Sequence, residues 1–146
     1  MNKNIIVIRI VLVLVALAHL LIGAIGIIPA IPLSIVLKFY GSSITINLQM
    51  AHIIQMFGAY MFTIGILGAI AIWNPIKQKA IVYAISFLLF LRVLQRVIFA
   101  GQQFEVFAIP PTYYWAQTAI FFVFALCLVL FTLLASKTEE IKQKRI

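Results

Sequence analysis

Two arginines and two histidines are the residues of this chain whose types are suited to binding a polar ligand. Arg92 and Arg96 lie one helical turn apart with Gln95 between them, and His19 and His52 stand in other apolar stretches. Arginine presents a planar fork of N–H donors that matches phosphate, carboxylate or carbonyl oxygens. An imidazole adds one donor or acceptor at each ring nitrogen. These residue types indicate recognition of an anionic or carbonyl group.

Acidic residues, which most hydrolytic and metal sites need, are scarce. The chain has three acidic residues, all glutamate, and none lies in an apolar stretch. The two histidines fall short of the three or four ligands of a zinc site, and no phosphate-binding loop or paired-cysteine motif occurs. Bis-histidine haem is an alternative, which the different estimated depths of His19 and His52 disfavour. We therefore expect no firmly bound cofactor, with quinone or haem as alternatives, and a binding protein rather than a self-sufficient enzyme.

Composition places these residues in a membrane. Of 146 residues, 65% are hydrophobic and 10% are charged, whereas soluble domains are about 45–50% apolar and about 25% charged. This excludes a soluble globular domain and a disordered chain. The single cysteine, Cys127, lies inside an apolar stretch and excludes a disulfide-stapled secreted domain. The chain is predicted to be an integral membrane protein.

The apolar stretches predict an all-α, up-and-down four-helix bundle forming one transmembrane domain over residues 1–146. Each stretch is long enough to cross about 30 Å of hydrocarbon as a helix, and none alternates as a barrel strand would. The short connection between the second and third makes them antiparallel neighbours. The predicted spans are about 5–28, 48–73, 76–100 and 112–135.

Polar and proline residues mark the ends of these spans. Asn47 is the predicted N-cap of the second helix, Asn74-Pro75 the N-cap and first residue of the third, and Pro110-Pro111 the start of the fourth. The loop 29–47 is still apolar and predicts a short interfacial helix, with a lid over a site as the alternative. The tail 136–146 is predicted to continue the fourth helix.

Basic residues predict the orientation. Eight of them lie on one side of the predicted spans and only Lys38 lies on the other, so both termini are expected in the cytoplasm. The eight are Lys3, Arg9, Lys77, Lys79, Lys137, Lys142, Lys144 and Arg145. The net charge of +8 is then an orientation signal and an attraction to anionic lipids. No nucleic-acid partner is expected, because the cations are split among short segments.

A cleaved signal peptide is the alternative at the N-terminus. Ala16-Leu17-Ala18 resembles a cleavage site. Cleavage there would leave residues 20–28 as half a span, and Arg9 interrupts the apolar region. We therefore expect the first span to be retained.

Strongly polar side chains within the spans gather in the outer half of the membrane, apart from Arg9 at the cytoplasmic interface. Arg92, Gln95 and Arg96 share one helical stripe, and His52 and Gln55 share a face of the second helix. A charge at the centre of a membrane helix costs at least about 2.5–3.5 kcal/mol, less toward the interface. The one outer glutamate, in the loop before the fourth span, cannot neutralise two arginines.

We therefore predict an outer-leaflet polar pocket. In it, Arg92 and Arg96 bind an anionic or carbonyl group, and Gln95, His19, His52 and Gln55 supply hydrogen bonds. The expected ligand is a lipid headgroup or a quinone-like molecule.

Alternatives give these residues a structural role in place of ligand binding. In one, Arg96, and less readily the deeper Arg92, snorkels toward outer phosphates. In another, the glutamines and His19 serve as interhelical hydrogen-bond partners within the bundle. Ala51, Gly58 and Gly65 recur every seven residues and predict a tight helix contact, either internal or across a homodimer.

The chain resembles a loose group of small bacterial four-span membrane proteins, similar in layout to the DoxX-like proteins. The resemblance covers about half of the chain and rests on Leu37-Lys38-Phe39-Tyr40-Gly41, on the second span with Gly58, Gly65 and its Asn74-Pro75 stop, and on Leu91-Arg92-Val93-Leu94-Gln95-Arg96. It implies a fold and a multi-pass location in the bacterial cytoplasmic (inner) membrane. Some members are linked to quinone-dependent redox enzymes, and no catalytic residue carries over.

The function predicted from these observations is that of a binding or accessory subunit. Its expected partners are membrane lipids and a homodimer or larger membrane complex. A small dimeric transporter is the main alternative, although the apolar inner half of every span offers no continuous polar route. A structural subunit of a larger complex is the third.

Overall fold

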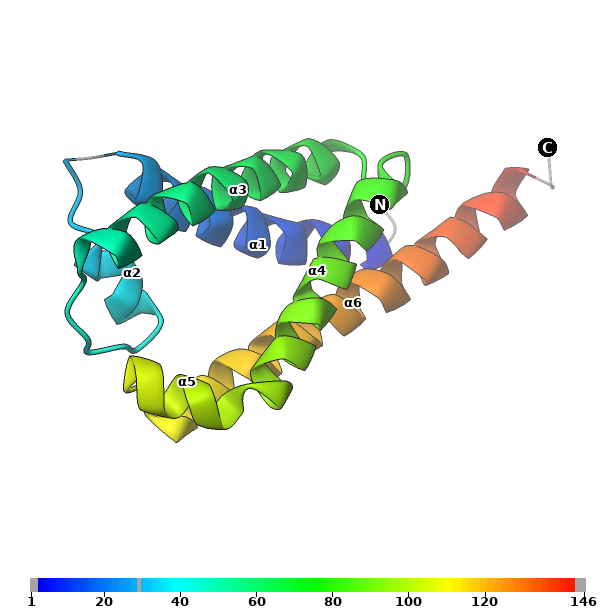
Figure 1. Cartoon of the computed structure of the whole chain (residues 1–146). Coiled ribbons are helices and arrows are strands. Elements are labelled where there is room, and N and C mark those ends of the chain that lie inside the picture. Colours follow the sequence, from blue (N-terminus) through cyan, green and yellow to red (C-terminus); the bar gives the residue numbers. More distant parts are fainter. Residues whose placement is uncertain (1–2, 29, 144–146) are drawn as a thin grey trace.

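The computed structural model describes residues 3–28 and 30–143, and in this part of the chain every regular element is a helix. The helices are α1 (Lys3–Ile27), α2 (Ser34–Phe39), α3 (Leu48–Trp73), α4 (Lys79–Ile98), α5 (Ala100–Phe107) and α6 (Pro111–Gln143) (Figure 1). Four of them, α1, α3, α4 and α6, are long and apolar enough to cross a membrane. The prediction of an all-α, multi-pass membrane protein with four spanning helices is confirmed.

The third span differs from its predicted bounds at both ends. The Oδ1 atom of Asn74 accepts a hydrogen bond of 3.1 Å from the backbone N–H of Lys77, and the Asn74 carbonyl accepts one of 3.0 Å from Gln78 N–H. Asn74 and Pro75 therefore form a turn, and α4 begins only at Lys79. Phe99, with φ −104° and ψ 18°, interrupts the helix at its other end and separates α4 from α5. The prediction that Asn74 and Pro75 begin the third helix is wrong.

The loop between the first two spans contains the predicted short helix, α2, which Gly41 follows. Gly41 has φ +75°, a conformation that only glycine adopts without strain. A Cβ atom there would also lie 2.5 Å from the Tyr113 ring. Helix α2 therefore ends just before Gly41, where the chain turns against Tyr113 of α6.

The N-cap predicted at Asn47 is present, since its Oδ1 atom accepts a 2.8 Å hydrogen bond from Met50 N–H. We expect Asn47→Ala to lower the free energy of unfolding by about 1 kcal/mol, as the loss of such a cap does in other helices. Thermal unfolding in detergent, followed by circular dichroism, measures the change. Ser43→Ala, an exposed change in the same loop, is the control. Equal melting temperatures of the two variants would contradict a capping role.

Helices α1 and α3 pack together through glycines, so their backbones touch. A Cβ atom on Gly58 would lie 2.8 Å from the Cα of Gly26, and one on Gly23 would lie 2.5 Å from the backbone nitrogen of Phe62. Gly65 meets α1 in the same way. The small-residue contact predicted along α3 is thus made inside the chain, against α1.

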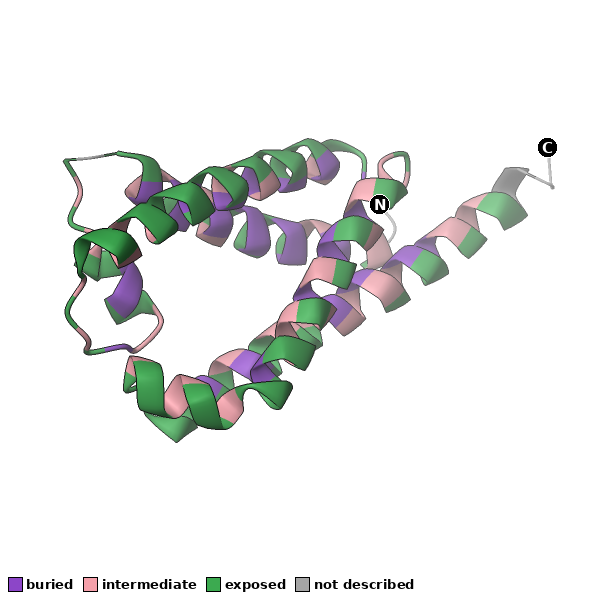
Figure 2. Ribbon diagram, viewed as in Figure 1, coloured by how far each residue is buried: buried purple, intermediate pink, exposed green. Residues whose placement is uncertain are grey.

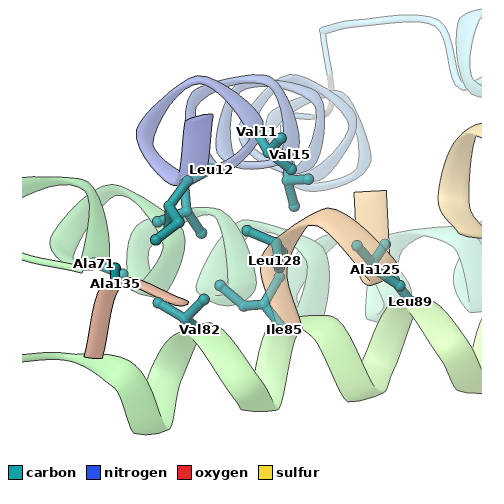
Figure 3. Close-up of a cluster of buried hydrophobic side chains, with 11 residues drawn as sticks. Val11, Leu12, Val15, Ala71, Val82, Ile85, Leu89, Ala125, Leu128 and Ala135 are labelled. Carbon is teal, nitrogen blue, oxygen red and sulfur yellow. The ribbon is translucent and has the colours of Figure 1, made fainter. Parts of the chain in front are cut away.

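The main hydrophobic core lies where all four spanning helices meet, near the described beginning of α1. Figure 3 shows its side chains converging from α1 (Val11, Leu12, Val15), α3 (Ala71), α4 (Val82, Ile85, Leu89) and α6 (Ala125, Leu128, Ala135). The outward faces of the same helices are largely exposed (Figure 2), as expected of helices that face lipid. At this end Arg9 Nη2 donates a 2.8 Å hydrogen bond to the Trp73 carbonyl and so satisfies the end of α3.

The helices form two pairs, α1 with α3 and α4 with α6. The pairs meet at this core and diverge toward the end that carries α2 and α5, as Figure 1 shows. The α3–α4 turn lies at the narrow end, and α6 extends beyond it, as predicted for the tail through residue 143. Residues 144–146 of the predicted tail lie outside the described residues. The divergence leaves room between the pairs at the wide end.

Candidate functional site: a cavity between the helix pairs

A cavity of about 600 Å³ occupies the wide end of the molecule. Its walls come from all six helices, mostly from α3, with α4, α2 and α5 completing them. Most of its lining side chains are apolar, including Ile54, Phe57, Met61 and Phe121. Among the residues that the structure describes, Arg92 and Arg96 are the charged residues of the lining, and no carboxylate lines it. Two of the predicted ligand residues thus share a largely apolar cavity.

Arg96 is anchored to α6. Its Nε donates to Thr118 Oγ1 at 2.8 Å, and its Nη2 donates to the Tyr114 carbonyl at 3.1 Å and to Gln117 Oε1 at 3.2 Å. The guanidinium carbon lies 4.0 Å from the centre of the Tyr114 ring, a cation–π contact. With 8% of its surface exposed, Arg96 does not snorkel as one alternative predicted. Its Nη1 group has no protein partner among the described residues.

Arg92 is less well satisfied, although it is half-buried. Its Nη2 donates to the Met61 sulfur at 2.8 Å, and its guanidinium lies 6.0 Å from the centre of the Phe121 ring. A thioether is a weak acceptor, and no acidic side chain in the described part of the chain pairs with Arg92. Most of the donors of this guanidinium are therefore available to a ligand in the cavity.

The two glutamines beside these arginines have different roles. Gln95 is exposed and lines the cavity. Gln117 accepts from Arg96 and donates through Nε2 to the Phe39 carbonyl at 3.0 Å, so it ties α6 to the end of α2. Gln117 therefore has the role of interhelical hydrogen-bond partner that one alternative gave to the glutamines.

His19 is 4% exposed and lies in α1 outside the cavity lining. Its Nδ1 lies 2.7 Å from the Val15 carbonyl, which can only accept, so Nδ1 carries the proton. Its Nε2 is buried and has no hydrogen-bond partner among the described residues. His19 is thus buried in α1 and is not one of the lining residues of the cavity.

His52 and Gln55 lie on the exposed face of α3, and neither lines the cavity. They are exposed, and the structure does not place them with the arginines on the cavity lining. His52 and the buried His19 are also not gathered at the cavity. Of the six predicted site residues, the structure brings together Arg92, Gln95 and Arg96.

Two residues that shape the site were not predicted from the sequence. Tyr114 is fully buried, stacks on Arg96 and donates from its hydroxyl to the Arg96 carbonyl at 2.8 Å. Met61, the second of them, lies between Gly58 and Gly65 along α3, and its sulfur accepts the hydrogen bond from Arg92. The four-residue spacing of Tyr114 and Thr118 marks one face of α6 and was the available signal.

Comparisons of the chain with protein-family models, with curated proteins and with solved structures gave no match. The resemblance to the DoxX-like proteins stays a prediction.

Proposed function

We propose that this protein binds an amphiphilic membrane molecule, with the polar head at Arg92 and the apolar part along the cavity wall. The observation that carries the proposal is the half-buried Arg92 guanidinium on the wall of a cavity without a carboxylate. The ligands that fit this chemistry are a lipid headgroup and a quinone-like carbonyl compound. Both present oxygen acceptors to the guanidinium and carry an apolar tail.

The energetics support a ligand over an empty cavity. Holding a guanidinium within a membrane helix costs free energy unless its donors find acceptors. Thr118, Tyr114 and Gln117 supply acceptors to Arg96, whereas Arg92 has a sulfur. A ligand oxygen would form a charge-assisted hydrogen bond there, of the kind that contributes about 1.5–3 kcal/mol.

The shape of the cavity agrees with this role. Its volume of about 600 Å³ falls within the range of about 300–1,000 Å³ for small-molecule sites. Apolar walls with few polar groups are usual for such sites. We propose a binding or accessory subunit of the bacterial cytoplasmic membrane. The basic residues at the narrow end would put the cavity in the outer leaflet.

The test compares ligand retention in the wild-type protein and in Arg92→Gln. Each is purified in mild detergent from the membranes of the expression host and analysed by native mass spectrometry. We expect the wild type to retain an amphiphile and Arg92→Gln to retain about tenfold less, since one charge-assisted hydrogen bond is worth about that factor.

Lys38→Gln is the matched control, because it removes one positive charge at an exposed position of α2 outside the cavity lining. It should retain the ligand. Thermal unfolding shows whether Arg92→Gln remains folded. Equal retention by the wild type and a folded Arg92→Gln, or no retained amphiphile in the wild type, would refute the proposal.

A further inference from the structure

We infer that the occupant of this cavity is an anionic phospholipid that enters sideways from the bilayer between α3 and α4. The inference rests on the proposed function and narrows it to one ligand class. The charge of the cavity wall, the donors that remain available there and the position of the opening support it together.

The charge of the wall favours an anion over a neutral carbonyl compound. Arg92 and Arg96 give the lining two positive charges, and no acidic residue lines it. The three glutamates of the chain lie elsewhere, Glu105 exposed on α5 and the other two near the far end of α6. A quinone carbonyl accepts hydrogen bonds but leaves the charge uncompensated, whereas a phosphate supplies both acceptor oxygens and negative charge. In a medium of low dielectric constant this difference is larger than in water.

The available donors suit a phosphate. The hydrogen bonds of Arg96 to α6 use its Nε and Nη2 atoms and leave Nη1 without a protein partner in the described chain. Arg92 uses one nitrogen, on the Met61 sulfur. Gln95, next to Arg96 in the sequence, adds an exposed amide to the same lining. The guanidinium carbons of Arg92 and Arg96 lie 6.0 and 5.7 Å from the centre of the same Phe121 ring. The two groups therefore lie near one part of the lining and offer several donors for the oxygens of one phosphate.

Part of the cavity lining is exposed on two candidate membrane spans. Ile53 and Phe57 of α3 line the cavity and are still 56% and 62% exposed, and on α4 the exposed lining residue is Gln95. The exposed lining residues thus lie on two helices, α3 and α4, which diverge from their connecting turn toward the wide end (Figure 1). Both helices are candidate membrane spans, so apolar lining residues exposed on them would contact acyl chains. A molecule that reaches the arginines by this route comes from within the leaflet.

The apolar part of the cavity wall suits an acyl chain. The apolar lining residues include Ile22, Ile54, Phe57, Met61 and Phe121. None of these carries a group that would orient a second polar head. We therefore place the phosphate at Arg92 and Arg96 and one acyl chain along the α3 wall toward the α3–α4 gap.

The experiment titrates delipidated full-length protein in detergent with four probes and measures binding by native mass spectrometry. The probes are phosphatidylglycerol, phosphatidylcholine with identical acyl chains, a neutral isoprenoid quinone, and glycerol phosphate, which has the head without the tail. We expect phosphatidylglycerol to bind about tenfold more tightly than phosphatidylcholine. Glycerol phosphate should not bind at the same concentrations, because it lacks the apolar tail.

Variants assign the preference to the cavity. Arg92→Gln should reduce the preference for phosphatidylglycerol to about twofold or less, and Arg92→Lys should keep part of it, because lysine retains the charge without the fork. Lys38→Gln should keep all of it. The preference should persist at about 1 M salt, where the Debye length is about 3 Å and attraction to the exposed surface is suppressed. If Arg92→Gln does not fold, Arg92→Lys and the salt series carry the test.

The possible failures are distinguishable. If the quinone binds in an Arg92-dependent way and the two phospholipids bind equally, the inference is wrong and the proposed function stands. If no amphiphile binds in an Arg92-dependent way, both are wrong. A species of twice the mass with no bound lipid would show that a second copy of the chain covers the gap, and would overturn the inference.

Discussion

Gly58→Leu should lower the free energy of unfolding by about 3 kcal/mol, at the upper end of the usual cost of overpacking. A Cβ atom at this position would lie 2.8 Å from the Cα of Gly26 and 2.9 Å from its carbonyl carbon. These are backbone atoms, so they can move only if α1 moves away from α3. Membrane helices lack a hydrophobic force that holds them together, and close packing replaces it. Moving α1 away from α3 therefore removes the close packing that mainly holds these two helices together.

Ala59→Leu is the matched control, since it adds the same side chain one residue further along α3 at an exposed position. Unfolding of both variants by a denaturing detergent, followed by circular dichroism, gives the difference. The measurement is repeated at several protein concentrations. A loss of stability that is independent of concentration indicates the internal α1–α3 contact. Equal stability of Gly58→Leu and Ala59→Leu would show that the helices are not this close.

Tyr114→Ala should have a comparable effect, a loss of about 3 kcal/mol, at the lower end of the range for removing a large buried aromatic side chain. The lower end applies because lipid is as apolar as the site, so the loss comes from the cavity left behind and not from transfer out of water. Tyr114 is fully buried, and its ring contacts Phe104 of α5 at a centroid distance of 5.0 Å. The same ring stacks on Arg96.

Tyr114→Phe separates the ring from the hydroxyl. It keeps the stacking and loses the hydrogen bond to the Arg96 carbonyl, for an expected cost of about 1 kcal/mol. Thermal unfolding of the two variants measures both values. If Tyr114→Phe were as unstable as Tyr114→Ala, the hydroxyl and not the packing would be the main contribution. If neither lost stability, the stacking of Tyr114 on Arg96 would be without consequence.

The sequence alone predicted the four spanning helices, the short helix after the first of them and the N-cap at Asn47. These features depend on local properties. The length of an apolar stretch decides whether a helix can cross the membrane, and an asparagine side chain caps the helix that begins beside it. The predicted helix boundary at Asn74 was wrong because an asparagine side chain stabilises a turn as well as a helix start. In both cases its Oδ1 accepts from the backbone N–H three residues later, here that of Lys77.

Part of the candidate site was also predictable. Arg92, Gln95 and Arg96 share a stripe because of their spacing along one helix, and the structure places all three on the cavity lining. Spacing relates residues within a helix and says nothing about which way that helix is rotated in the bundle. His52 and Gln55 share a face by the same rule, and that face is exposed.

Only the tertiary structure decided which faces meet. The contact of Gly58 with Gly26 sets the rotation of α3 against α1 and turns His52 outward. Tyr114 and Thr118 bind Arg96 to α6, so Arg92 is the arginine with more N–H donors available to a ligand. The sequence determined that this chain spans a membrane and carries two arginines without enough acids to neutralise them. The divergence of the helix pairs decided that they face a cavity, because helix rotation and splay follow from side-chain packing between elements far apart in the chain.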